Sequence, residues 1–442
     1  MKKQSNIFIL IIIILIIILG VLIYYTLNNT LISNQGNNMP EMSNMQGGAP
    51  GMQSQNSSES TSASGATEIS DEQTLSNKSY DSSTDGESAL LIQNGGSATI
   101  SDSEINKTGN SSDENADFYG TNAGILVNNN GTLDLSNSKI ITNGSHANGL
   151  FVYGTGKATV TDTTIDTSSN NSGGIMVAGG GTLTANNLTI QTDGNSSASI
   201  RSDRGGGTIE VNGGTYLTNG VGSPSIYSTA DITVNNAVLT STKSEGAIVE
   251  GANSITLNHV TLIDTNTTLN GNSQTYKNIF LYQSMSGDAN EGNATFTAIN
   301  STITTNKGDT IFVTNTTATI NLESNKFINN DGDFLRIQSG KWGTSGSNGG
   351  NVTLNANNQE IDGNIIVDNI STLEFNLTSG SSYTGTINKE NQAKLINLKL
   401  DSTSKIKLTG DSYVTSLDDE DTSYSNIDFN GYKLYVNGTA IN

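Results

Sequence analysis

Arginine occurs only three times in this chain of 442 residues, and its three positions share one kind of setting. Arg201 and Arg204 lie in the stretch SIRSDRGGGTIEV, and Arg336 lies in FLRIQSGKW. Both stretches place apolar residues in alternation and next to glycine, which is typical of short β-strands that end in turns. A guanidinium group can bind a carboxylate or a sulfate through paired hydrogen bonds. Its role therefore depends on the strand face from which it projects.

Other side chains that commonly perform catalysis or bind metals are few. The absence of cysteine excludes disulfides, thiolate metal sites and cysteine nucleophiles. His146 and His259 are the only histidines, which disfavours a multi-histidine zinc site. Acidic runs occur at 112–117, 331–333 and 418–421, and none matches an EF-hand loop. We expect solvated loops there, with weak Ca²⁺ bridging as the alternative, and no other cofactor.

The charge balance narrows the class of partner. The chain has 41 acidic and 20 basic residues, a formal net charge of −21. Binding to nucleic acid requires clustered lysine and arginine, so we expect no nucleic-acid partner. A strongly acidic, well-hydrated surface is compatible with a location outside the cell.

The N-terminus predicts a membrane anchor. Residues 1–6 are short and basic, and residues 7–25 form an uncharged apolar run that is long enough for a bilayer-spanning helix. Lys2 and Lys3 favour a cytoplasmic N-terminus, and hence a single-pass protein of the cell membrane with its remainder outside the cell. A cleaved signal peptide is the alternative. Residues 26–74 are rich in Asn, Ser, Gly and Met, and predict a disordered stalk.

A repeat dominates the remainder of the chain, from 75 to 442. Successive units begin at Ala123, Asn148, Gly173 and Ala198, which are 25 residues apart. Each unit contains three short stretches of alternating apolar residues, separated by Gly and Asn. Such units bury their apolar residues only by stacking, so the pattern predicts an all-β parallel solenoid of three strands per coil and about a dozen coils. The final stretch, 424–442, is predicted to cap the last coil.

The register predicts one outward column along the first strand of the coils. With Ile125 and Val127 pointing inward, Leu126 points outward, and the equivalent residues of later coils follow it. The predicted column contains Leu126, Phe151, Met176, Arg201, Tyr227, Val249, Phe280, Phe312 and Arg336, with Tyr153 and Tyr282 one alternation further along. The outward positions of the second strand carry Thr, Lys, Asp and Glu instead, which is typical of a solvated sheet surface.

Two interpretations of this apolar and aromatic column are open. It is either a platform for a glycan or for a surface or matrix protein, or a surface that the insertions 106–122, 264–278 and 284–293 cover. On the first interpretation, aromatic rings pack on the ligand, the arginines bind anionic groups, and Trp342 adds a further ring. The candidate binding residues are Leu126, Phe151, Tyr153, Met176, Arg201, Arg204, Tyr227, Phe280, Tyr282, Phe312, Arg336 and Trp342.

The 25-residue units of three strands resemble the right-handed parallel β-helix of the pectin-lyase-like superfamily, from about residue 75 to the C-terminal region. That superfamily includes polysaccharide lyases, polygalacturonases and adhesin-like bacterial surface proteins. The resemblance implies the right-handed form, which crossover connections also favour. A lyase of this fold implies a base, often Arg, and a Ca²⁺ site of several carboxylates, but only Asp203 accompanies Arg201. The Asn-Thr-Asp and Gly-His-Gly segments of the hydrolases are absent, and "RIQ" at Arg336 echoes their Arg-Ile-Lys strand only in part.

We therefore expect a membrane-anchored extracellular β-helix protein that acts in adhesion, glycan binding or envelope structure without catalysis. The first alternative is a polysaccharide lyase-like enzyme that acts on acidic glycans. The second alternative is a structural spacer without a ligand. The fold alone cannot choose among these functions, because one scaffold hosts many.

Overall fold

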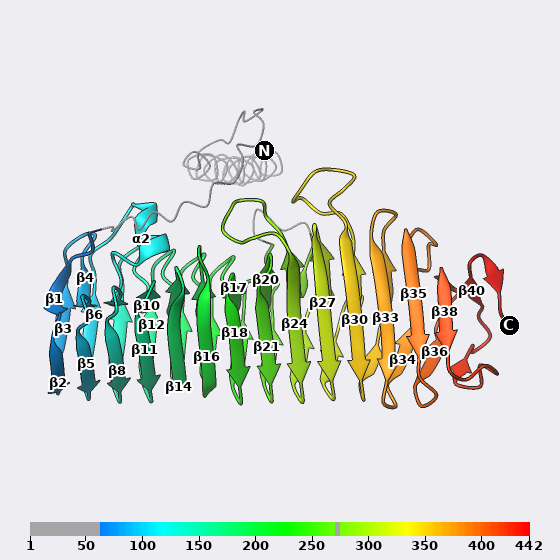
Figure 1. Cartoon of the computed structure of the whole chain (residues 1–442), viewed down its shortest axis with the longest axis horizontal. Coiled ribbons are helices and arrows are strands. Elements are labelled where there is room, and N and C mark those ends of the chain that lie inside the picture. Colours follow the sequence, from blue (N-terminus) through cyan, green and yellow to red (C-terminus); the bar gives the residue numbers. More distant parts are fainter. Residues whose placement is uncertain (1–61, 270–274) are drawn as a thin grey trace, which may run out of the picture. The chain divides into compact units, whose positions relative to one another are not determined.

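The computed structural model describes residues 62–269 and 275–442, and these residues form a parallel β-solenoid of the right-handed type with about 15 turns. Three strands make each regular coil, and each strand pairs in parallel with its counterpart in the next coil (Figure 1). The all-β prediction is confirmed. The number of turns exceeds the predicted dozen because the least regular coils, near the two ends, carry little sequence signal.

The first strands of the coils form a sheet of 12 strands, which we call the first sheet. It comprises β1 (Gly65–Ile69), β4 (Ser88–Ile92), β7 (Ile125–Val127), β10 (Leu150–Tyr153), β13 (Ile175–Ala178), β15 (Ile200–Ser202), β17 (Ile226–Ser228), β20 (Ala247–Glu250), β23 (Lys277–Tyr282), β26 (Asp309–Thr314), β29 (Leu335–Ile337) and β32 (Ile365–Val367).

The second and third strands together form a sheet of 22 strands. The second strands are β2 (Glu72–Ser76), β5 (Ser97–Ser101), β8 (Thr132–Ser136), β11 (Lys157–Thr161), β14 (Gly181–Thr192), β16 (Gly207–Thr218), β18 (Asp231–Asn235), β21 (Ser254–Asn258), β24 (Asn293–Ile299), β27 (Thr316–Glu323), β30 (Gly350–Asn357), β33 (Thr372–Thr378), β35 (Leu395–Leu400) and β38 (Ser416–Asp419). The third strands are β3 (Ser79–Ser82), β6 (Glu104–Lys107), β9 (Lys139–Thr142), β12 (Thr164–Thr167), β19 (Val238–Ser241), β22 (Thr261–Asp264), β25 (Thr302–Thr305) and β28 (Lys326–Asn329), and in β14 and β16 the second and third strands are continuous.

Near the C-terminus the third strands continue in a separate sheet of four, and a sheet of three closes the end. The former contains β31 (Glu360–Asp362), β34 (Ser382–Gly385), β36 (Lys405–Leu408) and β39 (Ile427–Asp428), and the latter β37 (Ser412–Val414), β40 (Leu434–Val436) and β41 (Thr439–Ala440). Strand β41 runs antiparallel along β40, with Tyr435 opposite Ala440. The predicted cap at 424–442 thus contains the one antiparallel pairing among the described strands, and this pairing occupies a strand edge that would otherwise be exposed.

The interior consists of stacked apolar side chains in the predicted register. Ile125, Leu150, Ile175 and Ile200 are paired from coil to coil and fully buried. Burial of one such side chain contributes about 1.5–3 kcal/mol, so the stack is the main source of stability. Corner residues explain the abundant Asn and Asp, because Asn137, Asp162 and Asn187 occupy the same corner with positive φ.

The solenoid begins earlier than the predicted boundary at residue 75. Strands β1 and β2 already form the first coil, and β1 pairs in parallel with β4. Strand β2 consists mostly of polar residues that are exposed or half-buried. Its sequence therefore looks like the polar stretch that precedes it. The predicted stalk therefore ends before Gly65.

Three insertions that the structure describes in full project from the coils beside the first sheet, and residues 270–274 of the predicted insertion at 264–278 lie outside the described residues. One contains the short helix α2 (Glu114–Tyr119), whose N-cap Asp113 accepts a hydrogen bond from the Asn115 N–H. The others are the loops that follow β23 and β29 (Figure 1). In residues 62–269 and 275–442, no helix has the length and apolar character that a membrane crossing requires. The predicted tail, membrane segment and most of the stalk lie outside the described residues.

Candidate functional site

The predicted outward column exists, with one correction. Register pairs connect Leu126 to Phe151, Met176, Arg201 and Tyr227, and then to Ile248. The column continues through Phe280 and Phe312 to Arg336. The prediction of Val249 is wrong, because Val249 points into the core and Ile248 points outward. The preceding coil is shorter than 25 residues, and the apolar run Ala-Ile-Val contains no polar residue to identify the outer face.

The N-terminal half of the column is covered by the chain itself. Leu126, Phe151 and Met176 are fully buried and form a separate apolar cluster outside the solenoid interior. Gly120, the C-cap of α2, lies so close to Phe151 that a Cβ on it would stand 2.5 Å from the ring. These three side chains are therefore the centre of an intramolecular interface, and their assignment to a ligand surface is wrong for this conformation.

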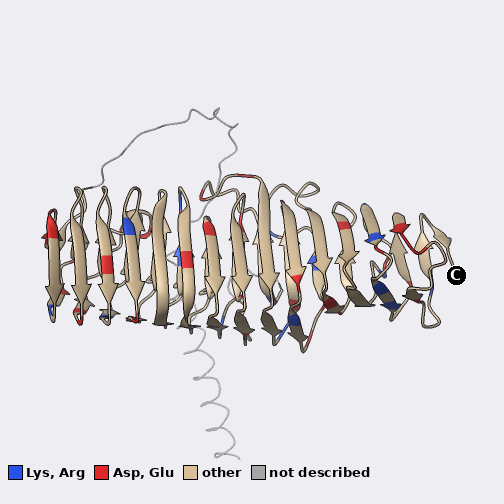
Figure 2. Cartoon of the chain, turned by 60° about the horizontal axis from the view of Figure 1, so that its bottom comes forward, with Lys and Arg blue, Asp and Glu red and all other residues tan. Residues whose placement is uncertain are grey.

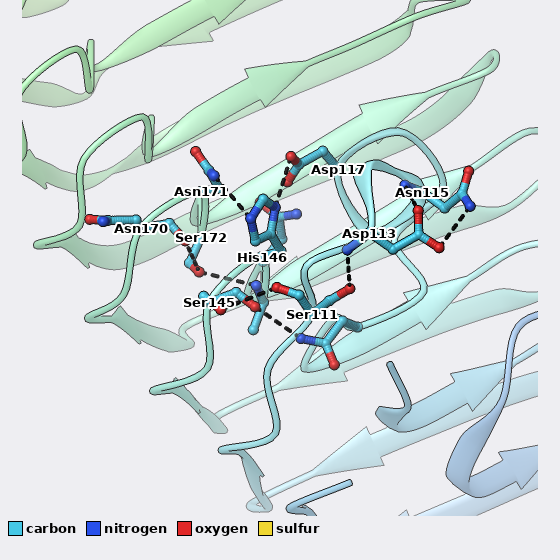
Figure 3. A network of polar contacts seen from close by, with 12 residues as sticks. Ser111, Asp113, Asn115, Asp117, Ser145, His146, Asn170, Asn171 and Ser172 are labelled. Carbon is cyan, nitrogen blue, oxygen red and sulfur yellow. Dashed lines mark hydrogen bonds and ion pairs between the residues drawn. The ribbon is translucent and has the colours of Figure 1, made fainter. Parts of the chain in front are cut away.

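The insertion at 106–122 is the cover, as the second interpretation predicted for this half. Tyr119 of α2 packs edge-on against Tyr153, with ring centroids 5.2 Å apart. Asp117 Oδ2 lies 2.9 Å from His146 Nδ1, and the opposite ring nitrogen lies 3.1 Å from Asn171 Nδ2 (Figure 3). The hydrogen bond from Asp117 raises the pKa of His146. Tyr153 is half-buried by this packing.

The C-terminal half of the column lines a cleft of about 160 Å³, which we call the aromatic cleft. Phe280 and Tyr282 stack with ring centroids 4.5 Å apart, and Phe312 lies 5.8 Å from Phe280. Trp342, on the loop after β29, lies 5.6 Å from Tyr282. The sequence predicted Phe280, Tyr282 and Phe312 on one face with Trp342 as a further ring from the next loop, and the structure brings these rings together with Tyr227 and Ile248.

A buried ion pair forms one wall of the aromatic cleft. Lys277 Nζ lies 3.0 Å from Glu245 Oε1, and both side chains are at most 5% exposed. The same ammonium group stands 4.5 Å from the centroid of the Phe280 ring, a cation–π distance. Burial acts to raise the pKa of Glu245, but the charge of Lys277, together with hydrogen bonds from Ser244, from Lys277 and from the backbone, outweighs burial and leaves that pKa lowered. Both groups were missed in the sequence because they lie beside insertions of irregular length.

A second buried carboxylate joins the tyrosines at the edge of the cleft. Glu250 accepts hydrogen bonds from the hydroxyls of Tyr227, Tyr282 and Ser284, the Tyr282 distance being 3.0 Å. The pKa of Tyr227 is raised well above its usual value, first by burial and then by Tyr282 and Glu250. This network holds the two tyrosine rings in place and keeps both hydroxyls protonated.

The arginines are engaged with carboxylates of the same chain. Arg201 Nη2 lies 2.8 Å from Asp203 Oδ2, and Arg204 Nε lies 2.5 Å from Asp288 Oδ1. The Arg204 guanidinium also stacks 3.7 Å above the Phe118 ring of α2. Two insertions that are far apart in sequence thus meet at Arg204.

Arg336 is bound by two carboxylates at the other end of the column. Its Nε and Nη2 atoms lie 2.7 Å and 2.5 Å from Asp309 and Asp333. Arg336 therefore shares the predicted column but forms intramolecular ion pairs instead of a free anion site.

Arg201 is poorly suited to act as a lyase base. Burial acts to lower the pKa of Arg201, but the charges of Asp203 and Asp117 outweigh it, and that pKa is raised. A base must release its proton before it can accept another. In the described part of the chain, no group of three or more acidic, His or Cys side chains could hold a metal ion. The Ca²⁺ site that a lyase of this fold implies therefore has no candidate among these residues.

The surface of the second strands differs from the column. Lys, Arg, Asp and Glu occur there as isolated bands on otherwise uncharged strands (Figure 2). Outward asparagines form hydrogen-bonded ladders, such as Asn258 to Asn235 to Asn212. Among the described residues, outward rings thus gather beside the first sheet, apart from the stacked pair Tyr413 and Tyr435 on β37 and β40.

Comparison of the chain with protein-family models, with curated proteins and with solved structures found no match. The resemblance to the pectin-lyase-like superfamily therefore rests on the coil architecture alone, and the site must be interpreted from its own geometry.

Proposed function

We propose that the protein is a non-enzymatic glycan-binding protein of the cell surface, and that its ligand packs in the aromatic cleft. The observation that carries this proposal is the convergence of Tyr227, Phe280, Tyr282, Phe312 and Trp342 on one concave site. Binding sites combine apolar and aromatic walls with a few placed polar groups. The apolar faces of sugar rings match such walls, and Lys277, Lys341 and Gln338 supply polar atoms for hydroxyl groups.

The location at the cell surface is a separate part of the proposal. It is supported by the basic residues 1–6 and the apolar run 7–25, followed by a polar stretch that leads into the first coil. Protease treatment of intact cells tests it. The proposal requires that the solenoid be accessible to the protease while the chain stays in the membrane fraction.

The single tryptophan makes the binding proposal directly testable. Trp342 is the only tryptophan of the chain and lines the aromatic cleft, so its fluorescence reports ligand entry. We expect glycans that bind the full chain, solubilised in detergent, to change the intensity or wavelength of this emission. A glycan array and a titration of each hit provide the measurement.

Two variants separate the outcomes. Phe312→Ala should weaken binding of every hit, whereas Asp134→Asn, an exposed change on β8, should leave binding unchanged. A chain that binds no glycan, or that binds glycans equally well after Phe312→Ala, would overturn the proposal. The first of these outcomes would favour a structural spacer.

A further inference from the structure

A second cavity adjoins the aromatic cleft on its N-terminal side. Its volume is about 360 Å³, and Gly222, Pro224 and Tyr227 line both spaces. We call it the arginine cavity, because the guanidinium of Arg201 lies in its wall. Its lining comes from α2, from the three corners that precede β13, β15 and β17, from β15 and β17 themselves, and from the loop after β23.

Arg201 has hydrogen-bond donors to spare in this cavity. Its side chain is only 17% exposed, and Nη2 is committed to Asp203. Within residues 62–269 and 275–442, no oxygen accepts a hydrogen bond from Nε or Nη1 of Arg201, and neither atom is fully buried. Both are therefore open to the cavity, where a ligand can replace water as the acceptor.

Asp117 provides a hydrogen-bond acceptor next to the donors of Arg201. Its Oδ2 is bound by His146, while its Oδ1 is buried and has no partner in the described chain (Figure 3). Asp117 also lies near enough to Arg201 for its charge to raise the pKa of that arginine. The cavity therefore presents unused donors and one unused acceptor from two neighbouring side chains.

The charges around the cavity argue against an anionic ligand. Asp117, Asp203 and Asp288 line it, and each carboxylate already has a cationic partner in His146, Arg201 or Arg204. The cavity therefore holds no excess positive charge to offset the desolvation of an added anion. A neutral group that provides both an acceptor and a donor matches the arrangement better.

The remaining wall is apolar. Phe118, Ala198, Pro224 and Tyr227 line the cavity beside the two polar groups. A hydroxyl group could satisfy one of the unused polar atoms, but it leaves this apolar wall without a contact. A planar amide with an attached methyl group uses both kinds of surface.

From these contacts we infer that the arginine cavity binds the acetamido group of an N-acetylated sugar. The acetamido oxygen accepts a hydrogen bond from Arg201, the acetamido N–H donates to Asp117 Oδ1, and the methyl group packs on the apolar wall. The sugar then continues across Tyr227 toward the aromatic cleft. This inference rests on the proposed glycan binding and specifies the class of sugar.

The test compares two oligosaccharides with the same β1,4 linkage. Calorimetric titration of the full chain in detergent should show at least tenfold tighter binding of the N-acetylglucosamine tetramer than of the glucose tetramer. If the two bind equally well, the inference is wrong and the proposed function stands. If neither the tetramers nor any glycan of the array binds, the proposed function itself fails.

Asp117→Asn provides the matched variant. The asparagine oxygen can still accept the hydrogen bond of His146, but its NH₂ group then replaces the unused acceptor with a donor. We expect Asp117→Asn to lose most of the tenfold preference for the N-acetylglucosamine tetramer over the glucose tetramer. Asp134→Asn makes the same chemical change on an exposed position of β8 and should preserve the preference. A full preference in Asp117→Asn would overturn the inference, and thermal unfolding of each variant confirms that it is folded.

Discussion

The two halves of the outward column share one register but have opposite surroundings. Phe151 and Phe312 project from equivalent positions of the first sheet, yet α2 packs directly on Phe151 whereas Phe312 lines the aromatic cleft. The strands are the same in kind, and the insertions differ. The insertion that contains α2 covers Phe151, whereas the loops after β23 and β29 lie at the edge of the aromatic cleft. The contrast is one of degree, because Phe151 is fully buried whereas Phe280, Tyr282 and Phe312 keep 6–8% of their surface exposed at the cleft. An apolar column on a solenoid is therefore a candidate site only where the insertions leave such an opening.

The largest expected loss of stability is at Phe151, in the half of the column that α2 covers. Phe151→Ala should destabilise the protein by about 3–5 kcal/mol, because the buried ring leaves a cavity beneath α2. Phe312→Ala should cost less, because one side of its ring faces the cleft. Chemical denaturation of both variants provides the measurement. An equal or larger loss in Phe312→Ala would contradict the contrast between the halves.

A pH effect should arise beside the cleft. Asp264 replaces the inward hydroxyl that Thr142, Thr167 and Thr192 supply in the covered half. Burial raises the pKa of Asp264 from 3.8 to about 7. Between those two values the folded chain retains a proton that the unfolded chain has lost, so stability falls as the pH rises.

The slope approaches about 1.4 kcal/mol per pH unit if this carboxyl group acts alone. Asp264→Asn should flatten the decline between pH 4 and pH 7 and stabilise the protein at neutral pH. Denaturation across this pH range measures both effects. An unchanged pH profile would show that Asp264 does not titrate there.

A smaller pH effect should arise at the cover. Asp117 raises the pKa of His146 above 6.5, so the folded state binds the proton more tightly than the unfolded state. The resulting stabilisation is complete below pH 6.5 and disappears as the pH rises through the folded-state value. His146→Gln should remove this dependence at a cost of less than about 1.5 kcal/mol. The protection factors of the α2 backbone amides, which are corrected for the intrinsic pH dependence of amide exchange, should then become independent of pH near 6.5. Protection factors that still fall with rising pH in His146→Gln would contradict the role of His146.

The smallest expected effect on stability is at the cleft rim. Trp342→Ala should change the free energy of unfolding by no more than about 0.5 kcal/mol, because the loop after β29 projects from the coils. The same variant should weaken glycan binding. A large loss of stability would indicate that the Trp342 ring is a structural part of the column.

Much of the architecture could be predicted from residue order. The 25-residue spacing from Ile125 to Leu150 to Ile175 places equivalent side chains in contact, and the coil stack follows from it. The prediction failed where coil length changed, as at Ile248 and Val249, and at β1 and β2, whose polar strands resemble a stalk. Alternation identifies a face only when polar residues mark the other face.

The site was less predictable than the fold. The sequence placed Phe280, Phe312 and Arg201 on one face, but it did not identify Glu245, Lys277 or Asp117 as their neighbours. Asp117 lies in an insertion and Glu245 at a corner, and Lys277 begins β23 directly after an insertion, so the 25-residue period predicts none of the three. The Asp117–His146 contact spans 29 residues, and the Arg204–Asp288 contact spans 84.

By itself, the sequence determined the stacked coils and, in coils of regular length, the side of the strand from which each residue projects, because alternation and unit length are local properties of the chain. The tertiary structure alone decided which part of the column is covered and which part lines a cleft. That outcome depends on where each insertion packs. Packing is set by contacts such as Tyr119 with Tyr153 and Phe118 with Arg204, whose partners lie in different coils.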